Sequence, residues 1–101
     1  MHTLYISLLD GFEDEMAIIK VNGDTVFQKE AIFSKLSKGY AEEVEVQVDE
    51  GDVEVEFSLP LRDLSERVTI KVLSPIYLGF SLHHEKIQYK ASLTPLLREN
   101  Q

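Results

Sequence analysis

The chain has 101 residues, a formal net charge of −8, 44% hydrophobic residues and no cysteine. This length fits a single domain that buries a core without disulfides, and the lack of cysteine excludes a thiolate metal site. The negative charge argues against nucleic acid and anionic membrane surfaces as partners, because their phosphates would repel the chain.

The N-terminal residues are not typical of a secretory signal. Residues 1–10 contain only a short apolar run with no basic leader. No window approaches the roughly 18 consecutive apolar residues that a membrane-spanning helix needs. We therefore expect a cytoplasmic protein that does not insert into a membrane.

The first third of the chain alternates apolar with polar residues, as β-strands do. Residues 3–9 form the first such run, and Asp10-Gly11 ends it. Residues 16–21 (MAIIKV) are apolar on both faces, which is typical of a strand covered on both sides. The Asn22-Gly23 pair then predicts a tight hairpin turn into residues 25–28.

The clearest pattern runs from Val44 to Leu59 (VEVQVDEGDVEVEFSL), where apolar residues recur with a period of two on both sides of an acidic turn. It predicts a β-hairpin with Val46 opposite Val55 on a dry face. The other face would then crowd acidic groups. Solvent and salt, a bound cation, a basic partner or a neighbouring strand such as the one carrying Lys71 would have to offset that repulsion.

The remaining segments complete the expected strands. Residues 29–40 are expected to be a loop with a short strand or one helical turn. Residues 61–66 are expected to form a crossing loop after Pro60, followed by a strand at residues 68–72. Two further runs predict a hairpin in which Leu82, Phe80 and Leu78 lie opposite Ile87, Tyr89 and Ala91.

Seven or eight short strands with regular turn signals predict an all-β protein, an antiparallel β-sandwich. A small closed β-barrel is the alternative. We expect one domain over residues 1–92 and a loosely held tail over residues 93–101.

Two acidic segments are candidates for a calcium site, because calcium takes several oxygen ligands. The sequence does not say whether the two segments share one end of the fold, and a solvated acidic surface is the plain alternative. The candidate ligands are Asp10, Glu13, Asp14, Asp49, Glu50 and Asp52.

No catalytic residue and no cofactor is predicted. The adjacent His83 and His84 would point in different directions on a strand, and no serine lies in a G-x-S-x-G elbow. Tyr5, Tyr40 and Tyr77 could take part in binding a sugar, although half-buried tyrosines are common. An enzyme with a dispersed site stays a minority alternative.

Self-association has better support, because a strand apolar on both faces needs cover on each side and one sandwich supplies cover on only one. Met16 and Ile18 are the interface candidates, with residues 29–40 as alternative cover. We therefore expect a noncatalytic binding or assembly module that forms a homo-oligomer or binds an unknown protein or small ligand. A calcium-dependent binding domain is the first alternative.

Three segments resemble those of a group of short bacterial proteins of unknown function. They are VNGDTVF (residues 21–27), the acidic valine stretch with SLPLRDLS (residues 58–65), and PIYLGFS (residues 75–81). The resemblance covers most of residues 20–92. It implies an all-β fold and a bacterial source, and it implies no active residues.

Overall fold

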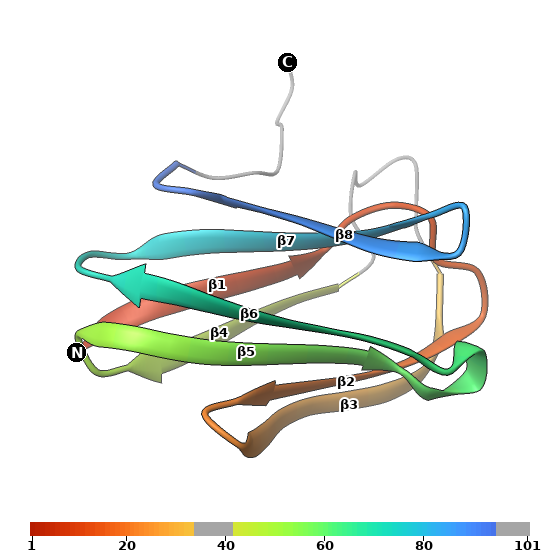
Figure 1. The fold of residues 1–101 in the computed structure, drawn as a ribbon, viewed down its shortest axis with the longest axis horizontal. Helices are drawn as coiled ribbons and strands as arrows, with labels where there is room; N and C mark the ends of the chain where they lie inside the picture. Colours follow the sequence, from red (N-terminus) through yellow and green to blue (C-terminus); the bar gives the residue numbers. More distant parts are fainter. Residues whose placement is uncertain (34–41, 95–101) are drawn as a thin grey trace.

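A computed structural model describes residues 1–33 and 42–94, which form two four-stranded sheets packed face to face (Figure 1). Sheet I has the strand order β4-β1-β7-β8, and sheet II has the order β3-β2-β5-β6. The elements are β1 (His2–Leu8), β2 (Glu15–Val21), β3 (Asp24–Ile32), β4 (Glu42–Val48), β5 (Gly51–Leu59), a 3-10 turn (Pro60–Arg62), β6 (Leu64–Val72), β7 (Ile76–His83) and β8 (Lys86–Ser92). The predicted sandwich is confirmed, and the described strands do not close into a barrel.

One strand pair departs from the predicted antiparallel arrangement. β1 pairs with β4 antiparallel but with β7 parallel, and Ile6 lies beside Leu78. Two parallel neighbouring strands need a long connection that brings the chain back to the end of the sheet where the first strand began. Here that connection includes all of sheet II, so the prediction of a wholly antiparallel sandwich is wrong for this pair.

The predicted hairpin of Val44 to Leu59 is wrong. β4 pairs with β1 in sheet I, whereas β5 pairs with β2 and β6 in sheet II. The chain crosses between the sheets at Asp49 and Glu50, so Val46 and Val55 belong to different sheets. The alternation itself is correct, because it reports which face of a strand is dry and not which strand lies beside it.

Both other predicted hairpins are confirmed. Asn22 and Gly23 have φ values of 50° and 88°, and Val21 pairs with Asp24 across this two-residue turn. Such turns require positive φ at both central residues, which asparagine and glycine tolerate. The β7–β8 ladder has the predicted register, with Phe80 opposite Tyr89.

Two segments are more regular than expected. β3 continues to Ile32 rather than ending near residue 28, and residues 34–41 lie outside the described residues. In place of the crossing loop at residues 61–66, the short turn Pro60–Arg62 leads directly into β6. In the tail, residues 95–101 lie outside the described residues.

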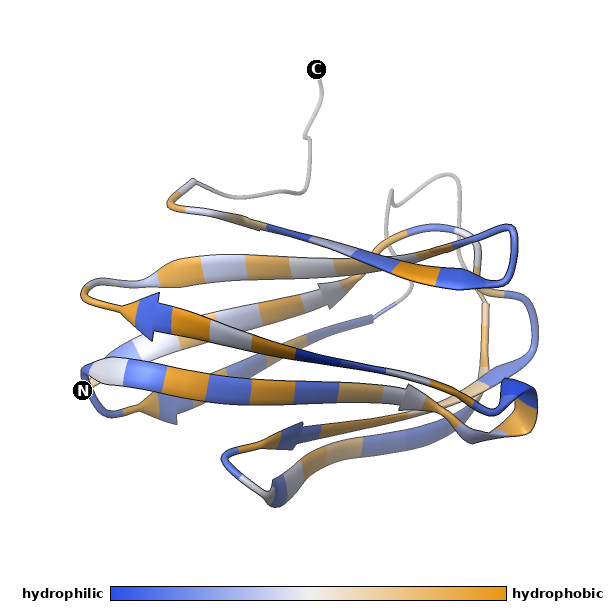
Figure 2. Cartoon of the chain, in the orientation of Figure 1, coloured by the Kyte–Doolittle hydropathy of each residue, from blue (hydrophilic) through white to orange (hydrophobic). Residues whose placement is uncertain are grey.

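The core lies between the sheets and is formed by inward side chains of β1, β2, β5, β6 and β7, to which the edge strands β3 and β4 add Ile32 and Val48. Figure 2 shows the alternation of hydrophobic and hydrophilic residues along β5 and β6 that produces one dry face. Three aromatic rings join the sheets at the centre. Phe57 of β5 stacks on Phe80 of β7 at 4.6 Å, and Phe12 contacts Phe57 edge-on at 6.0 Å.

Candidate functional site

The two acidic segments lie at opposite ends of the sandwich (Figure 1). Asp10 follows the end of β1, whereas the β4–β5 connection follows Val48, which pairs with His2 at the start of β1. Residues 1–33 and 42–94 contain no group of three or more histidine or acidic side chains that could hold a metal. One site built from all six candidates is therefore ruled out, and calcium binding at either segment alone stays a prediction.

The histidines sit at the ends of the sandwich as single groups. His83 Nε2 lies 3.5 Å from a carboxylate oxygen of Asp10, and His2 Nε2 lies 3.3 Å from Glu50. His84 occupies the β7–β8 turn with φ 53°. Each described histidine thus meets at most one carboxylate, an arrangement that ties a strand end to a loop.

An ion pair joins the buried Glu15 at the start of β2 to the partly exposed Arg62 in the 3-10 turn. Glu15 is only 2% exposed; Nε of Arg62 donates to its Oε2 at 2.6 Å, and Nη2 of Arg62 lies 2.6 Å from the same oxygen. This hydrogen bond raises the pKa of Arg62 above its usual value, and the charges of Glu15, Glu85 and Glu13 act in the same direction. No local sequence pattern links Glu15 to Arg62, which lies 47 positions away.

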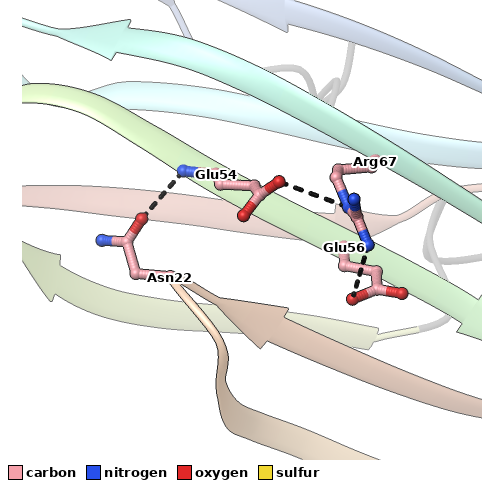
Figure 3. A network of polar contacts seen from close by, with 4 residues as sticks. All are labelled: Asn22, Glu54, Glu56 and Arg67. Carbon is pink, nitrogen blue, oxygen red and sulfur yellow. Dashed lines mark hydrogen bonds and ion pairs between the residues drawn. The ribbon is translucent and has the colours of Figure 1, made fainter.

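The outer face of sheet II carries a ladder of compensated charges. Arg67 of β6 lies 3.3 Å from Glu54 and 3.9 Å from Glu56 of β5 (Figure 3). The backbone N–H of Glu54 donates to the side-chain oxygen of Asn22 at 2.9 Å, which ties the β2–β3 turn to β5. Lys71 lies opposite Asp52 in the same ladder. A neighbouring cationic strand is therefore what offsets the acidic residues of β5.

The interface candidates Met16 and Ile18 lie on this same outer face. Ala17 and Ile19 point into the core and are fully buried, so Met16 and Ile18 point outward, where they are half-buried. Leu61 beside them is 72% exposed. A hollow of about 270 Å³ opens here, lined by Asp14, Met16, Glu30, Ala31 and Leu61.

Two of the three tyrosines considered for sugar binding stack on each other, and sugar binding stays a prediction. Tyr5 of β1 and Tyr77 of β7 lie side by side on the outer face of sheet I and stack at 4.5 Å with an interplanar angle of 9°. Each ring therefore turns one face toward its neighbour rather than toward a ligand. Tyr40, the third candidate, lies outside the described residues.

A second hollow of about 270 Å³ lies on the outer face of sheet I. It is lined by Leu9, Asp10, Gly79, Ser81, His83, Gln88, Tyr89 and Lys90. Gly79 contributes no side chain, which leaves space between the neighbouring strands. The lining is polar and carries both signs of charge, so it selects no single class of ligand.

The chain matches no protein-family model, no curated protein and no solved structure. Among residues 1–33 and 42–94, no helix is long and apolar enough to span a membrane. The resemblance to short bacterial proteins of unknown function stays a prediction.

Proposed function

We propose that the protein is a noncatalytic assembly module that binds a second copy of itself through the outer face of sheet II. The observation that carries this proposal is the outward position of Met16 and Ile18 on β2, an inner strand of the sheet. Leu61, which is 72% exposed, extends the same apolar surface. Covering these side chains would remove apolar area from water.

The charges on this face support a second copy as the partner. Outward residues of β2, β5 and β6 comprise three cations and three acids, although the whole chain has a net charge of −8. Balanced charge over these three strands lowers the repulsion between two copies of an acidic protein, although Asp14 and Glu30 add negative charge beside the hollow. The six residues are Lys20, Arg67, Lys71, Asp52, Glu54 and Glu56.

The area of the outer face of sheet II indicates how tightly two copies would bind. Four strands spaced about 4.8 Å apart and about seven residues long present about 450 Å². Two copies would bury about 900 Å² in total, which lies below the range of stable complexes and within that of transient ones. The dimer is therefore expected to be weak and to depend on protein concentration.

Sedimentation equilibrium over a range of concentrations tests the proposal. We expect Leu61→Lys to reduce dimer formation without affecting the core, because Leu61 is exposed outside the strands. Ile18→Lys should do the same, provided that its circular dichroism spectrum shows a folded protein. Leu73→Lys is the matched control, since Leu73 is 62% exposed and follows β6 at the end of sheet II away from Met16.

The control and the variants separate the outcomes. Unchanged dimer formation in folded Leu61→Lys and Ile18→Lys, or equal loss in Leu73→Lys, would contradict the assignment of this face. A wild-type chain that remains monomeric up to about 1 mM would overturn self-association itself, because a contact with that dissociation constant would still be half-populated there.

A further inference from the structure

The two edges of sheet I carry opposite charges. On β4, Glu43 and Glu45 point to the outer face, and on β8, Lys86 and Lys90 point to the same face. Among the described residues, no ion pair engages Glu45, Lys86 or Lys90. One edge of the sheet is therefore acidic and the other is basic.

Charges on edge strands ordinarily prevent sheets from joining edge to edge. In this protein the charges oppose the pairing of two β4 edges or of two β8 edges, but not the pairing of a β4 edge with a β8 edge. Two copies joined β8 to β8 would gather four lysines on one face, and two copies joined β4 to β4 would gather four glutamates, both of which are unfavourable. A β8 edge beside a β4 edge instead brings opposite charges together.

We propose that β8 of one copy pairs in parallel with β4 of a second copy, so that sheet I continues from copy to copy. The strand directions allow it. β4 is antiparallel to β1, β7 is parallel to β1, and β8 is antiparallel to β7, so β4 and β8 run in the same direction. A second copy in the same orientation as the first therefore presents its β4 to the β8 of the first copy without any rotation.

One register satisfies both faces of the joined strands. In this register Lys86 lies beside Glu43 of the second copy. Gln88 then lies beside Glu45, so that Lys90 is a diagonal neighbour of Glu45 on the outer face. On the inner face, Ile87 and Tyr89 then lie beside Val44 and Val46 of the second copy. A slip by one residue would place lysines beside valines, so side-chain alternation restricts the pairing to this register and those that differ from it by two residues.

The offset between the two sheets supports the same contact. In Figure 1, β8 extends beyond β6 on one side of the sandwich, and β3 extends beyond β4 on the other. Tyr89 points to the inner face yet is 49% exposed, because β8 overhangs sheet II. On the opposite side, Val26 and Phe27 of β3 are only half-buried.

The two overhangs complement each other. A second copy placed with its β4 beside β8 would bring its β3 beneath the overhanging β8, where Phe27 would cover Tyr89. After this contact the first copy would still have its β4 edge free, and the second copy its β8 edge. Such head-to-tail contacts produce rows or rings of copies rather than closed dimers. This contact goes beyond the proposed function, because it uses the edges of sheet I and not the outer face of sheet II.

The test uses charge-swapped chains in the Leu61→Lys background, where pairing through the outer face of sheet II is expected to be weakened. The first variant carries Lys86→Glu and Lys90→Glu, so that both of its edges are acidic. The second carries Glu43→Lys and Glu45→Lys, so that both edges are basic. A control with Glu13→Lys and Asp14→Lys changes net charge by the same amount as the second variant but alters exposed residues of the β1–β2 connection, outside β4, β8 and β3.

Sedimentation velocity at up to about 1 mM protein, where weak contacts still register, gives the result. We expect the Leu61→Lys parent and the control to form species larger than dimers, which diminish at high salt. Each swapped variant alone should be monomeric, and an equimolar mixture of the two should regain the large species. A monomeric parent, a parent that stops at the dimer, swapped variants that still assemble alone, or a mixture that stays monomeric would each overturn the proposal.

Discussion

Gly11 provides the sharpest test of how the β1–β2 connection is built. It has φ 93°, and a Cβ added there would lie 1.8 Å from the carbonyl oxygen of Leu82. Positive φ costs an alanine about 1–2 kcal/mol, and overpacking adds about 1–3 kcal/mol. We therefore expect Gly11→Ala to lower the free energy of unfolding by about 2–5 kcal/mol.

The obstruction is backbone, so a side-chain rotation cannot relieve it. The N–H of Leu82 donates to the carbonyl oxygen of Asp10 at 3.0 Å, and the adjacent Phe12 is only 3% exposed in the core. Moving the connection away from β7 would break this hydrogen bond and draw Phe12 out of its contact with Phe57.

Gly23→Ala is the matched control. Gly23 has φ 88°, but nothing lies within 4 Å of an added Cβ, so only the backbone cost of about 1–2 kcal/mol applies. Equilibrium urea unfolding of both variants measures the difference directly. Thermal unfolding should show the same order, because each kcal/mol shifts the midpoint by about 4–8 °C in a domain of this size. Equal losses in the two variants would refute the predicted close approach to Leu82.

Two further predictions concern the core and the Glu15–Arg62 ion pair. Phe57→Ala removes the ring that stacks on Phe80 and should cost about 3–5 kcal/mol in urea unfolding, whereas a loss below about 1 kcal/mol would contradict the central position of Phe57. Arg62→Leu should destabilise more than Arg67→Leu, because Glu15 is buried and the partners of Arg67 are not. Since hydrogen bonding raises the pKa of Arg62, its contribution is fully present below the pKa of the unfolded chain, which lies well above about pH 10, and is lost only as pH rises through the folded value. The gap in stability between wild type and Arg62→Leu should thus be constant from about pH 8 to about pH 10, and a gap that shrinks across this range would contradict that sign.

Local patterns predicted which residues are buried and where tight turns fall. The Asn22-Gly23 turn and the β7–β8 register follow from residues close together in sequence, and both are confirmed. Their success has a physical basis, because a two-residue turn fixes which residues face each other across the hairpin. The alternation of Val53 and Val55 likewise identified the dry face of β5.

Partner strands could not be predicted in the same way. A valine at every second position gives β4 one dry face whether the chain turns back in the same sheet or crosses to the other. The Asp49-Glu50-Gly51 connection is compatible with a hairpin and with a crossing between sheets. In the fold, β4 and β5 lie in different sheets, so the chain crosses here. The parallel pairing of β1 with β7 depends on contacts between distant segments, which no short pattern reports.

The same distinction between local patterns and long-range contacts applies to the candidate surfaces. The alternation of residues 16–21 correctly placed Met16 and Ile18 opposite Ala17 and Ile19. The Glu15–Arg62 pair was missed, because only the packed fold brings the 3-10 turn to the start of β2. The opposite charges of β4 and β8 were visible in the sequence, but their meaning required knowing that both strands are edges of one sheet.

The separation of β4 and β5 into different sheets can be tested most directly by nuclear Overhauser effects between backbone protons. We expect cross-strand contacts that link Val46 to Leu4 in sheet I and Val55 to Val68 in sheet II, following the pairing of these strands. Cross-strand contacts between Val46 and Val55 would contradict the crossing and restore a hairpin in its place.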